Sequence, residues 1–176
     1  MIANIATGGV SLNILITGGT GFIGAALIPV LLAEGHKVIA VTRATRPYQQ
    51  GVTYIPAPTG SELFSPAIIA KADAIINLAG ENIGGHRWSD AVKTALLTSR
   101  LAITEKLVQS IARNKDQSKP FPKIFLNASA VGYYGVSQEA VFTETSPNGT
   151  GFLADVCSQW EEQALAVQAA NVRVVL

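Results

Sequence analysis

The stretch LNILITGGTGFIG, residues 12–24, decides the fold of this chain. Its first six residues are mostly apolar, as in a strand that is buried on both faces of a parallel sheet. Glycines follow at once, and residues 22–34 have the length and apolar spacing of a helix that ends at Gly35. A strand, a glycine turn and a helix in this order predict the start of a βαβ unit.

The same alternation continues along the rest of the chain. We expect further strands at residues 37–42, 52–55, 73–79, 123–128 and 172–176, and further helices at residues 61–72, 89–114 and 152–170. Pro66 weakens the first of these helices, whereas Ser89 is a good N-cap for the second. Strands that alternate with helices form parallel sheets through right-handed crossovers. The sequence therefore predicts an α/β fold, a Rossmann-type doubly wound parallel sheet with helices on both faces.

The length of the chain fits one domain. We assign residues 12–176 to that domain and interpret residues 1–11, which show no strong periodicity, as a loose leader. The chain ends inside the expected sixth strand, so we expect a C-terminal portion to be missing.

Composition excludes several classes of protein. The chain is 48% hydrophobic and carries a net charge of +1, which favours neither a disordered chain nor one that binds nucleic acid or an anionic membrane. Its single cysteine, Cys157, fits a reducing compartment. No lysine or arginine precedes Lys37, and no apolar run approaches the roughly 20 residues of a membrane span. We expect a cytoplasmic protein, and no metal site is predicted.

The glycine turn predicts a site for the diphosphate of a dinucleotide. Gly18 and Gly21 let the backbone turn tightly and approach a pyrophosphate, and Gly24 lets the helix pack closely on the strand. The free N–H groups at the helix start then face the phosphates. The alternative is a turn that uses glycine for its geometry alone. A Walker-type phosphate loop is excluded, because no Gly-Lys-Ser/Thr sequence follows.

The end of the second expected strand indicates which dinucleotide binds. NAD sites usually carry an acidic residue about 20 residues after the glycines, but this chain has Thr42 and Arg43 there, with Arg46 close behind. No acidic residue lies between Glu34 and Glu62. Since an arginine binds a 2′-phosphate that a carboxylate would repel, we predict NADP(H) as the cofactor in preference to NAD(H). The alternative is that Arg43 is an ordinary surface residue.

These features resemble the extended and atypical short-chain dehydrogenase/reductases. The resemblance is closer to one subgroup, the nucleoside-diphosphate-sugar epimerase-like family, whose members are also called cell-division-inhibitor-like proteins. It rests on the glycine spacing and on the motifs NLAGENI at 77–83, RW at 87–88, SR at 99–100, SAVGYYG at 129–135 and WE at 160–161. The resemblance covers residues 12–176 and implies a C-terminal substrate lobe beyond the sixth strand.

The resemblance also implies roles for individual residues. The pyrophosphate would be held by the turn, the adenosine end by the residues after the second strand, and the adenine and ribose edge by those after the fourth. The implied cofactor-binding residues are Gly18, Thr20, Gly21, Phe22, Ile23, Gly24, Thr42, Arg43, Leu78, Ala79, Gly80 and Arg100. For Arg100 the alternative is a salt bridge on the helix surface. Arg87 and Trp88 either contact substrate or form a packed loop. Related enzymes often pair through two long helices, which makes a homodimer one expectation.

The chain lacks the tyrosine–lysine pair that the superfamily uses for catalysis. The superfamily uses a tyrosine four residues before a lysine, aided by a serine, but no lysine follows Lys123. The corresponding helix positions fall on Leu153 and Cys157, which we interpret as apolar core positions. Ser129 stands where the superfamily places its serine. Our hypothesis is that Ser129 hydrogen-bonds a substrate carbonyl while one of the two candidate acids, Tyr133 or Tyr134, donates a proton.

Three functions remain open. The first is an NADP(H)-dependent oxidoreductase acting on an unknown carbonyl or alcohol. The second is a non-catalytic NADP(H) redox sensor, which the missing tyrosine–lysine pair favours. The third is a nucleotide-sugar epimerase, an enzyme that usually keeps tightly bound NAD, against which Arg43 argues.

Overall fold

The computed structural model describes residues 10–85 and 87–176. Its sheet has six strands: β1 (Asn13–Thr17), β2 (Lys37–Thr42), β3 (Val52–Pro56), β4 (Ala74–Asn77), β5 (Ile124–Asn127) and β6 (Arg173–Val175). They lie in the order β3-β2-β1-β4-β5-β6, and all neighbours pair in parallel. The order reverses between β1 and β4, which is where open α/β sheets bind ligands. The predicted Rossmann-type architecture is confirmed.

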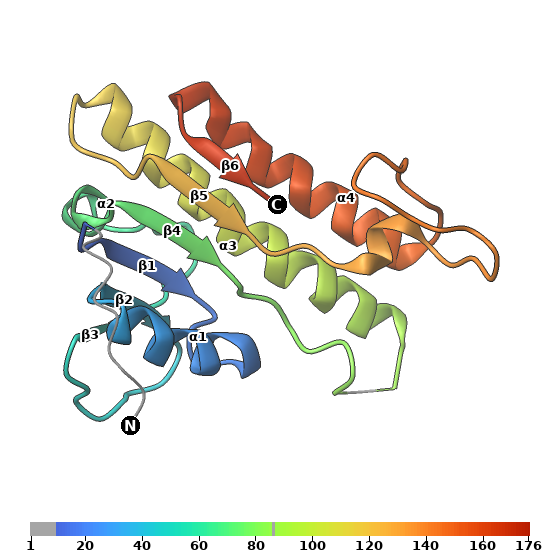
Figure 1. Cartoon of the computed structure of the whole chain (residues 1–176), viewed down its shortest axis with the longest axis horizontal. Helices are drawn as coiled ribbons and strands as arrows, with labels where there is room; N and C mark the ends of the chain where they lie inside the picture. Colours follow the sequence, from blue (N-terminus) through green and yellow to red (C-terminus); the bar gives the residue numbers. More distant parts are fainter. Residues whose placement is uncertain (1–9, 86) are drawn as a thin grey trace.

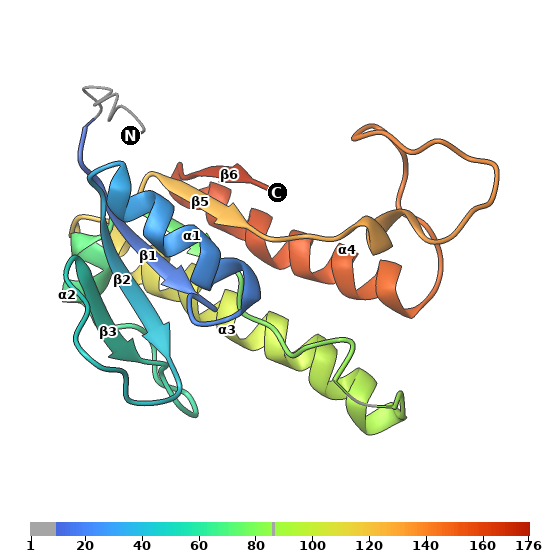
Figure 2. The same ribbon diagram turned by 60° about the horizontal axis from the view of Figure 1, so that its bottom comes forward.

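Helices cover both faces of the sheet (Figures 1 and 2). The helices are α1 (Phe22–Ala33), α2 (Pro66–Lys71), α3 (Asp90–Asp116) and α4 (Phe152–Leu165), with 3₁₀ turns η1 (Val131–Tyr134) and η2 (Ala166–Ala170). α1 packs on one face through Ile28, whereas α3 and α4 pack on the other through Leu107 and Ala164. The two long helices lie beside each other on that second face (Figure 1).

Alternation along the strands explains why both layers form. Leu15, Ile75 and Phe125 have no exposed surface and point toward α3 and α4. Their neighbours Ile14 and Ile16 point toward α1. Burying one such side chain contributes about 1.5–3 kcal/mol of hydrophobic free energy. The central strands are therefore anchored on both faces, as their nearly continuous apolar runs predict.

Some predicted elements differ in their bounds: the helix expected at 152–170 divides into α4 and η2, the strand expected at 73–79 shortens to β4, and the helix expected at 61–72 is wrong at its start. The helix expected at 61–72 begins only at Pro66, which suits a first helical position because it has no N–H to leave unpaired. The segment before it is held by hydrogen bonds to α3 instead. The Phe64 amide donates to Ser110 Oγ at 3.0 Å, and its carbonyl accepts from Arg113. These contacts join residues that are more than 40 positions apart, so no local pattern reports them.

The segment from 128 to 151 leaves the sheet at the end of β5 and projects outward (Figure 2). It contains η1, which the sequence did not predict. Asn148 Nδ2 and the Gly149 amide both donate to the Tyr133 carbonyl at 2.9 Å, which fixes the base of the projection. A Cβ on Gly149 would lie 2.2 Å from the Tyr134 carbonyl oxygen, so only glycine fits there.

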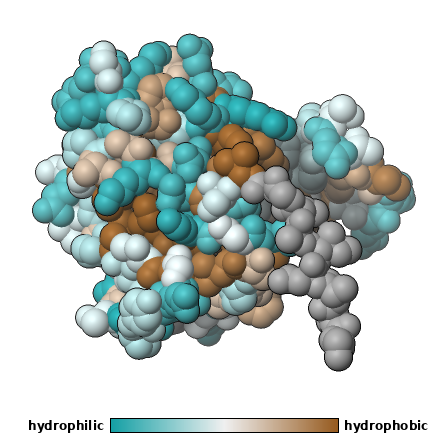
Figure 3. Space-filling view, turned by 60° about the vertical axis from the view of Figure 1, so that its left-hand side comes forward, coloured by the Kyte–Doolittle hydropathy of each residue, from teal (hydrophilic) through white to brown (hydrophobic). Residues whose placement is uncertain are grey.

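Figure 3 shows apolar side chains reaching the surface between hydrophilic ones. Within residues 10–85 and 87–176, none of the helices is both long and apolar enough to cross a membrane. The predicted leader falls mostly outside the described residues, except that Ser11 donates to the Gly35 carbonyl at 2.7 Å.

Candidate functional site

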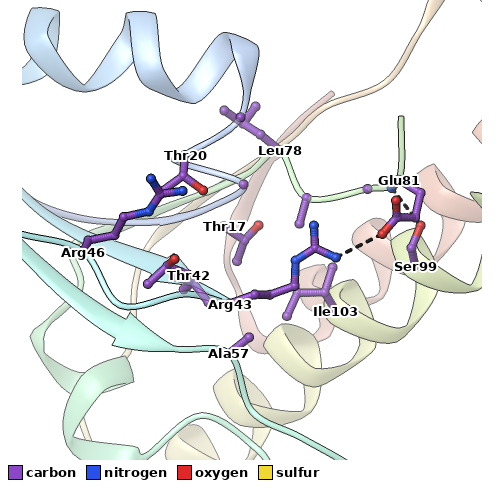
Figure 4. A pocket seen from close by; sticks show the side chains of 15 residues that line it. Thr17, Thr20, Thr42, Arg43, Arg46, Ala57, Leu78, Glu81, Ser99 and Ile103 are labelled. Carbon is purple, nitrogen blue, oxygen red and sulfur yellow. Dashed lines mark hydrogen bonds and ion pairs between the residues drawn. The ribbon is translucent and has the colours of Figure 1, made fainter. Parts of the chain in front are cut away.

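A cavity of about 440 Å³ opens at the carboxyl ends of β1, β2 and β4. Its walls are the glycine turn after β1, the residues at and after the end of β2, the segment after β4, and one side of α3 (Figure 4). This is the point where the strand order reverses. Location and walls together match the place where doubly wound sheets bind nucleotides.

The glycine turn is packed too tightly for a side chain at Gly18 or Gly24. Gly18 has a φ of +69°, and a Cβ on it would lie 2.7 Å from the carbonyl group of Leu78. A Cβ on Gly24 would lie 2.5 Å from the Gly18 carbonyl oxygen. Gly21 is the N-cap of α1 and has no side chain to accept from the first-turn amides. Those amides are therefore left to bind an anion.

The structure brings together most of the predicted cofactor residues. Those that line the cavity are Gly18, Thr20, Gly21, Thr42, Arg43, Leu78, Ala79 and Gly80. Phe22, Ile23 and Gly24 belong to the first turn of α1, outside the lining; the Phe22 side chain is 97% exposed, and Gly24 is buried against the turn. Any role of Phe22 and Ile23 toward a phosphate would fall to their backbone amides.

Several lining residues were not identified from the sequence. Thr17 ends β1, Ala57 follows β3, Glu81 follows the NLAG sequence, and Ser99 and Ile103 come from α3. The rule that ligands bind at the carboxyl ends of parallel strands could have identified Thr17 and Ala57. Ser99 lies in the SR motif at 99–100, but its place in the cavity wall, like that of Ile103, depends on how α3 lies across the sheet.

The segment after β2 provides two guanidinium groups. Arg43 and Arg46 both line the cavity, and Figure 4 shows their side chains projecting from the end of β2. Thr42 Oγ1 accepts from the Ala44 amide at 3.1 Å, which fixes the bend that presents Arg43. Arg43 Nη1 lies 3.0 Å from Glu81 Oε1 on the opposite wall. The predicted cationic end of the site thus faces a carboxylate.

Arg100 lies behind the wall after β4, and it does not line the cavity. Its guanidinium donates to the carbonyls of Leu96, at 2.8 Å, and Glu81, at 3.1 Å. It also lies 5.3 Å from the Trp160 ring, and a Cβ on Gly80 would come within 2.8 Å of its Cζ. Burial lowers the pKa of Arg100 from its ordinary value. Arg100 therefore supports the backbone at Gly80 and Glu81, and its contact with a cofactor stays a prediction.

A buried polar network lies beneath the site. Asn77 Nδ2 donates to Thr104 Oγ1 at 2.8 Å and to Asn127 Oδ1 at 2.6 Å, and Asn77 Oδ1 accepts from Thr17. Thr104 Oγ1 also accepts from Trp160 Nε1 at 2.9 Å. The network joins the ends of β1, β4 and β5 to both long helices. It fixes the positions of the backbone segments that form the cavity wall.

The candidate catalytic residues lie at the end of β5, outside the cavity lining. Ser129 donates its hydroxyl hydrogen to Glu161 of α4. Tyr133 and Tyr134 are the last two residues of η1. Their ring centroids lie 5.2 Å apart, edge to face, and the ring of Tyr134 stacks on that of Phe142 with centroids 5.4 Å apart. Sequence reasoning did not anticipate the partnership of Ser129 with Glu161, although both residues lie in motifs that it singled out.

Cys157 and Leu153 occupy the helix positions where a lysine and a tyrosine are absent. Cys157 is buried, and burial raises the pKa of its thiol, with a further contribution from Glu161. The interpretation of Cys157 as a core position is confirmed, and a raised pKa makes its thiol a weaker nucleophile near neutral pH. Leu153 is 36% exposed, so its assignment to the apolar core is wrong. Leu153 packs against η1: a Cβ built on Gly132 would lie 3.2 Å from the Cβ of Leu153.

Comparison with known proteins finds relatives that match most of the chain. Epimerase family protein ML0860 of Mycobacterium leprae is 39% identical over 163 residues, which cover 93% of this chain and 50% of that protein. The chain spans about half the length of the curated relatives it matches. The resemblance predicted from the motifs is confirmed.

Solved structures of related proteins also match this chain. The human epimerase family protein SDR39U1, in a crystal structure with NADPH, is 33% identical, with a TM-score of 0.69 over 87% of this chain and 48% of that chain. MoeE5 in complex with UDP-glucose and NAD has a TM-score of 0.71 over 92% of this chain and 51% of that chain; at 23% identity it shows the fold alone. Residues 14–166 match the NAD dependent epimerase/dehydratase family, and the chain belongs to that family.

Proposed function

We propose that this chain is the NADP(H)-binding part of an oxidoreductase that acts on a carbonyl or alcohol. The pyrophosphate would lie on the glycine turn, and the 2′-phosphate would lie between Arg43 and Arg46. The observation that carries the proposal is the presence of an uncapped helix start and two guanidinium groups around one cavity.

The preference for NADP(H) rests on the residues after β2. Arg43 and Arg46 match a phosphate monoester in charge and in hydrogen-bond geometry. The NADPH in the structure of human SDR39U1 supports the proposal, while the NAD in the MoeE5 complex shows that this fold accepts either cofactor. The preference therefore has to come from side chains at the adenosine end of the site.

The reacting end of the cofactor would lie toward β5. The cofactor supplies or accepts a hydride, and the chain must hold the substrate oxygen and move a proton. Ser129 would orient the oxygen, and a neutral Tyr133 or Tyr134 would donate the proton during reduction. Reduction starts from the protonated tyrosine, which regains its proton from water afterwards, whereas oxidation needs a tyrosinate at the start, and α4 carries no lysine to stabilise one.

Cofactor titration tests the binding proposal. NADPH and NADH are titrated into the protein by fluorescence, together with Arg43→Ala and Arg46→Ala. We expect tighter binding of NADPH, and about a tenfold loss of NADPH affinity in each variant with little change for NADH. Lys119→Ala, which removes an exposed charge after α3, is the control and should bind as wild type does. Equal affinity of the wild type for both cofactors would contradict the preference.

A second function, a sensor of the NADP(H) redox state, is favoured by one observation. Leu153 and Cys157 stand where the superfamily has tyrosine and lysine, and Leu153 packs against η1. The full-length protein should then bind NADPH without oxidising it in the presence of a panel of aldehydes and ketones. Turnover that is lost in Ser129→Ala would favour the oxidoreductase.

A further inference from the structure

The ion pair between Arg43 and Glu81 crosses the cavity, and it points to a residue that sets cofactor choice. We propose that Glu81 competes with the 2′-phosphate for Arg43, and that it thereby limits the preference of the site for NADP(H) over NAD(H). This inference rests on the proposed function, because it assigns Glu81 a role in the same nucleotide site.

Glu81 is held in place by its backbone. Its amide donates to Ser99 Oγ at 3.0 Å, and its carbonyl accepts from Arg100 Nη2 at 3.1 Å. Both partners lie on α3, which fixes the start of the segment after β4 against that helix. The side chain then points across the cavity, where Oε1 lies 3.0 Å from Arg43 Nη1 (Figure 4). The carboxylate therefore belongs to the wall that a bound adenosine would face.

Arg43 and Glu81 differ in exposure and in how firmly they are held in place. Arg43 is 86% exposed and follows a strand end, whereas Glu81 is 46% exposed and is anchored at its backbone. Exposed ion pairs contribute little to stability, so a phosphate with up to two negative charges can displace Glu81 from Arg43. Arg43 can turn toward the incoming phosphate, while the backbone of Glu81 stays where α3 holds it.

Displacement leaves the carboxylate of Glu81 near the new anion. The attraction between Arg43 and Glu81 is then lost, and Glu81 repels the bound 2′-phosphate across a short distance. A ribose with two free hydroxyls meets neither penalty, and a carboxylate is the group that NAD sites use to bind those hydroxyls. Both effects weaken NADP(H) relative to NAD(H). Arg46, which lines the same cavity, acts in the opposite direction.

The test compares ligands with and without the 2′-phosphate. The probes 2′,5′-ADP, 5′-AMP, NADP⁺ and NAD⁺ are titrated calorimetrically into wild type, Glu81→Gln, Arg43→Ala and the double variant. We expect Glu81→Gln to tighten the two phosphate-bearing ligands by about threefold to tenfold, with 5′-AMP and NAD⁺ changing less than about twofold. In the Arg43→Ala background the same change should have a smaller effect, since the competed group is gone.

The control is Glu162→Gln, which removes an exposed carboxylate from α4 without touching the cavity wall. Circular dichroism and thermal unfolding check that each variant folds. Raising the salt concentration should shrink the effect of Glu81→Gln, because the charges are exposed. Failure of that effect to depend on salt would count against the electrostatic cause.

Two results separate this inference from the proposed function. If the wild type prefers NADP⁺ but Glu81→Gln leaves the ratio of NADP⁺ to NAD⁺ affinity unchanged, or lowers it, Glu81 does not compete and the inference is wrong. If the folded wild type binds none of the four ligands, the proposed function fails, and the inference fails with it.

Discussion

Ser129, just past the end of β5, donates its hydroxyl hydrogen to the carboxylate of Glu161 on α4. A hydroxyl that donates to a carboxylate can still accept a hydrogen bond through its oxygen lone pairs. To donate to a substrate carbonyl, Ser129 must first release Glu161. The contact therefore ties the proposed substrate-orienting group to the helix that would otherwise have supplied a catalytic tyrosine and lysine.

The first prediction concerns the strength of this contact. We expect Ser129→Ala and Glu161→Gln each to lower the free energy of unfolding, with a coupling energy of about 1–2 kcal/mol in a double-mutant cycle, since hydrogen bonds to ionised groups are stronger than neutral ones. Urea unfolding of wild type, both single variants and the double variant measures it. Additive effects of the two changes would show that the contact contributes nothing.

The second prediction concerns the glycine turn. Gly24→Ala should lower the free energy of unfolding by about 1–3 kcal/mol, because the added Cβ would lie 2.5 Å from the Gly18 carbonyl oxygen. It should also abolish dinucleotide binding, since relief of the clash moves the turn. Gly84→Ala is the matched control, because its nearest neighbour would be at 3.7 Å. Thermal unfolding and NADPH titration of both variants decide it, and equal behaviour would contradict the packing argument.

Local patterns were enough to predict the sheet. The apolar runs and the glycines that end them mark β1, β2, β4 and β5 within two residues of their observed bounds. The glycine turn and Arg43 follow from the same logic, because the end of a strand fixes where its next residues lie. Most of the predicted cofactor residues consequently share one cavity.

Long-range contacts were beyond the sequence. Arg43 and Glu81 are 38 positions apart, and Trp160 meets Thr104 across 56 positions. Nothing in the composition of either segment indicates its partner, since the pairing depends on how α3 and α4 cross the sheet. The same holds for η1, which forms on the segment after β5 and packs over Leu153 and Cys157 of α4.

The third prediction concerns the polar network beneath the cavity. Thr104→Val keeps the shape of the side chain but removes the oxygen that accepts from Asn77 and Trp160. The Trp160 N–H and one of the two N–H groups of Asn77 then lack partners, and we expect a loss of about 2–4 kcal/mol in the free energy of unfolding. Thr98→Val on the same helix is the control: its exposed hydroxyl donates to Thr94, and its loss should change stability by less than about 0.5 kcal/mol. Urea unfolding at neutral pH compares the two variants, and similar losses in both would show that the buried network has no special role.

The last prediction concerns the effect of pH on stability through Cys157. Burial and the carboxylate of Glu161 raise the pKa of this thiol, while Arg100 and backbone hydrogen bonds from Ala130 and Tyr133 act to lower it. A thiol in the unfolded chain ionises near its ordinary pKa of about 8.5. Because the folded protein holds the proton more tightly, its stabilising contribution is complete below that pKa. The contribution is lost as pH rises from the unfolded pKa toward the folded one.

Wild type should therefore lose more stability than Cys157→Ala between neutral pH and about pH 10. Every other titratable group is common to both proteins, so the difference between the two curves isolates the thiol. Urea unfolding at a series of pH values measures each curve. The thiol should also react slowly with a thiol reagent at neutral pH in the folded state, and quickly once the chain is unfolded. Parallel stability curves for the two proteins would mean that the environment of Cys157 does not oppose its ionisation.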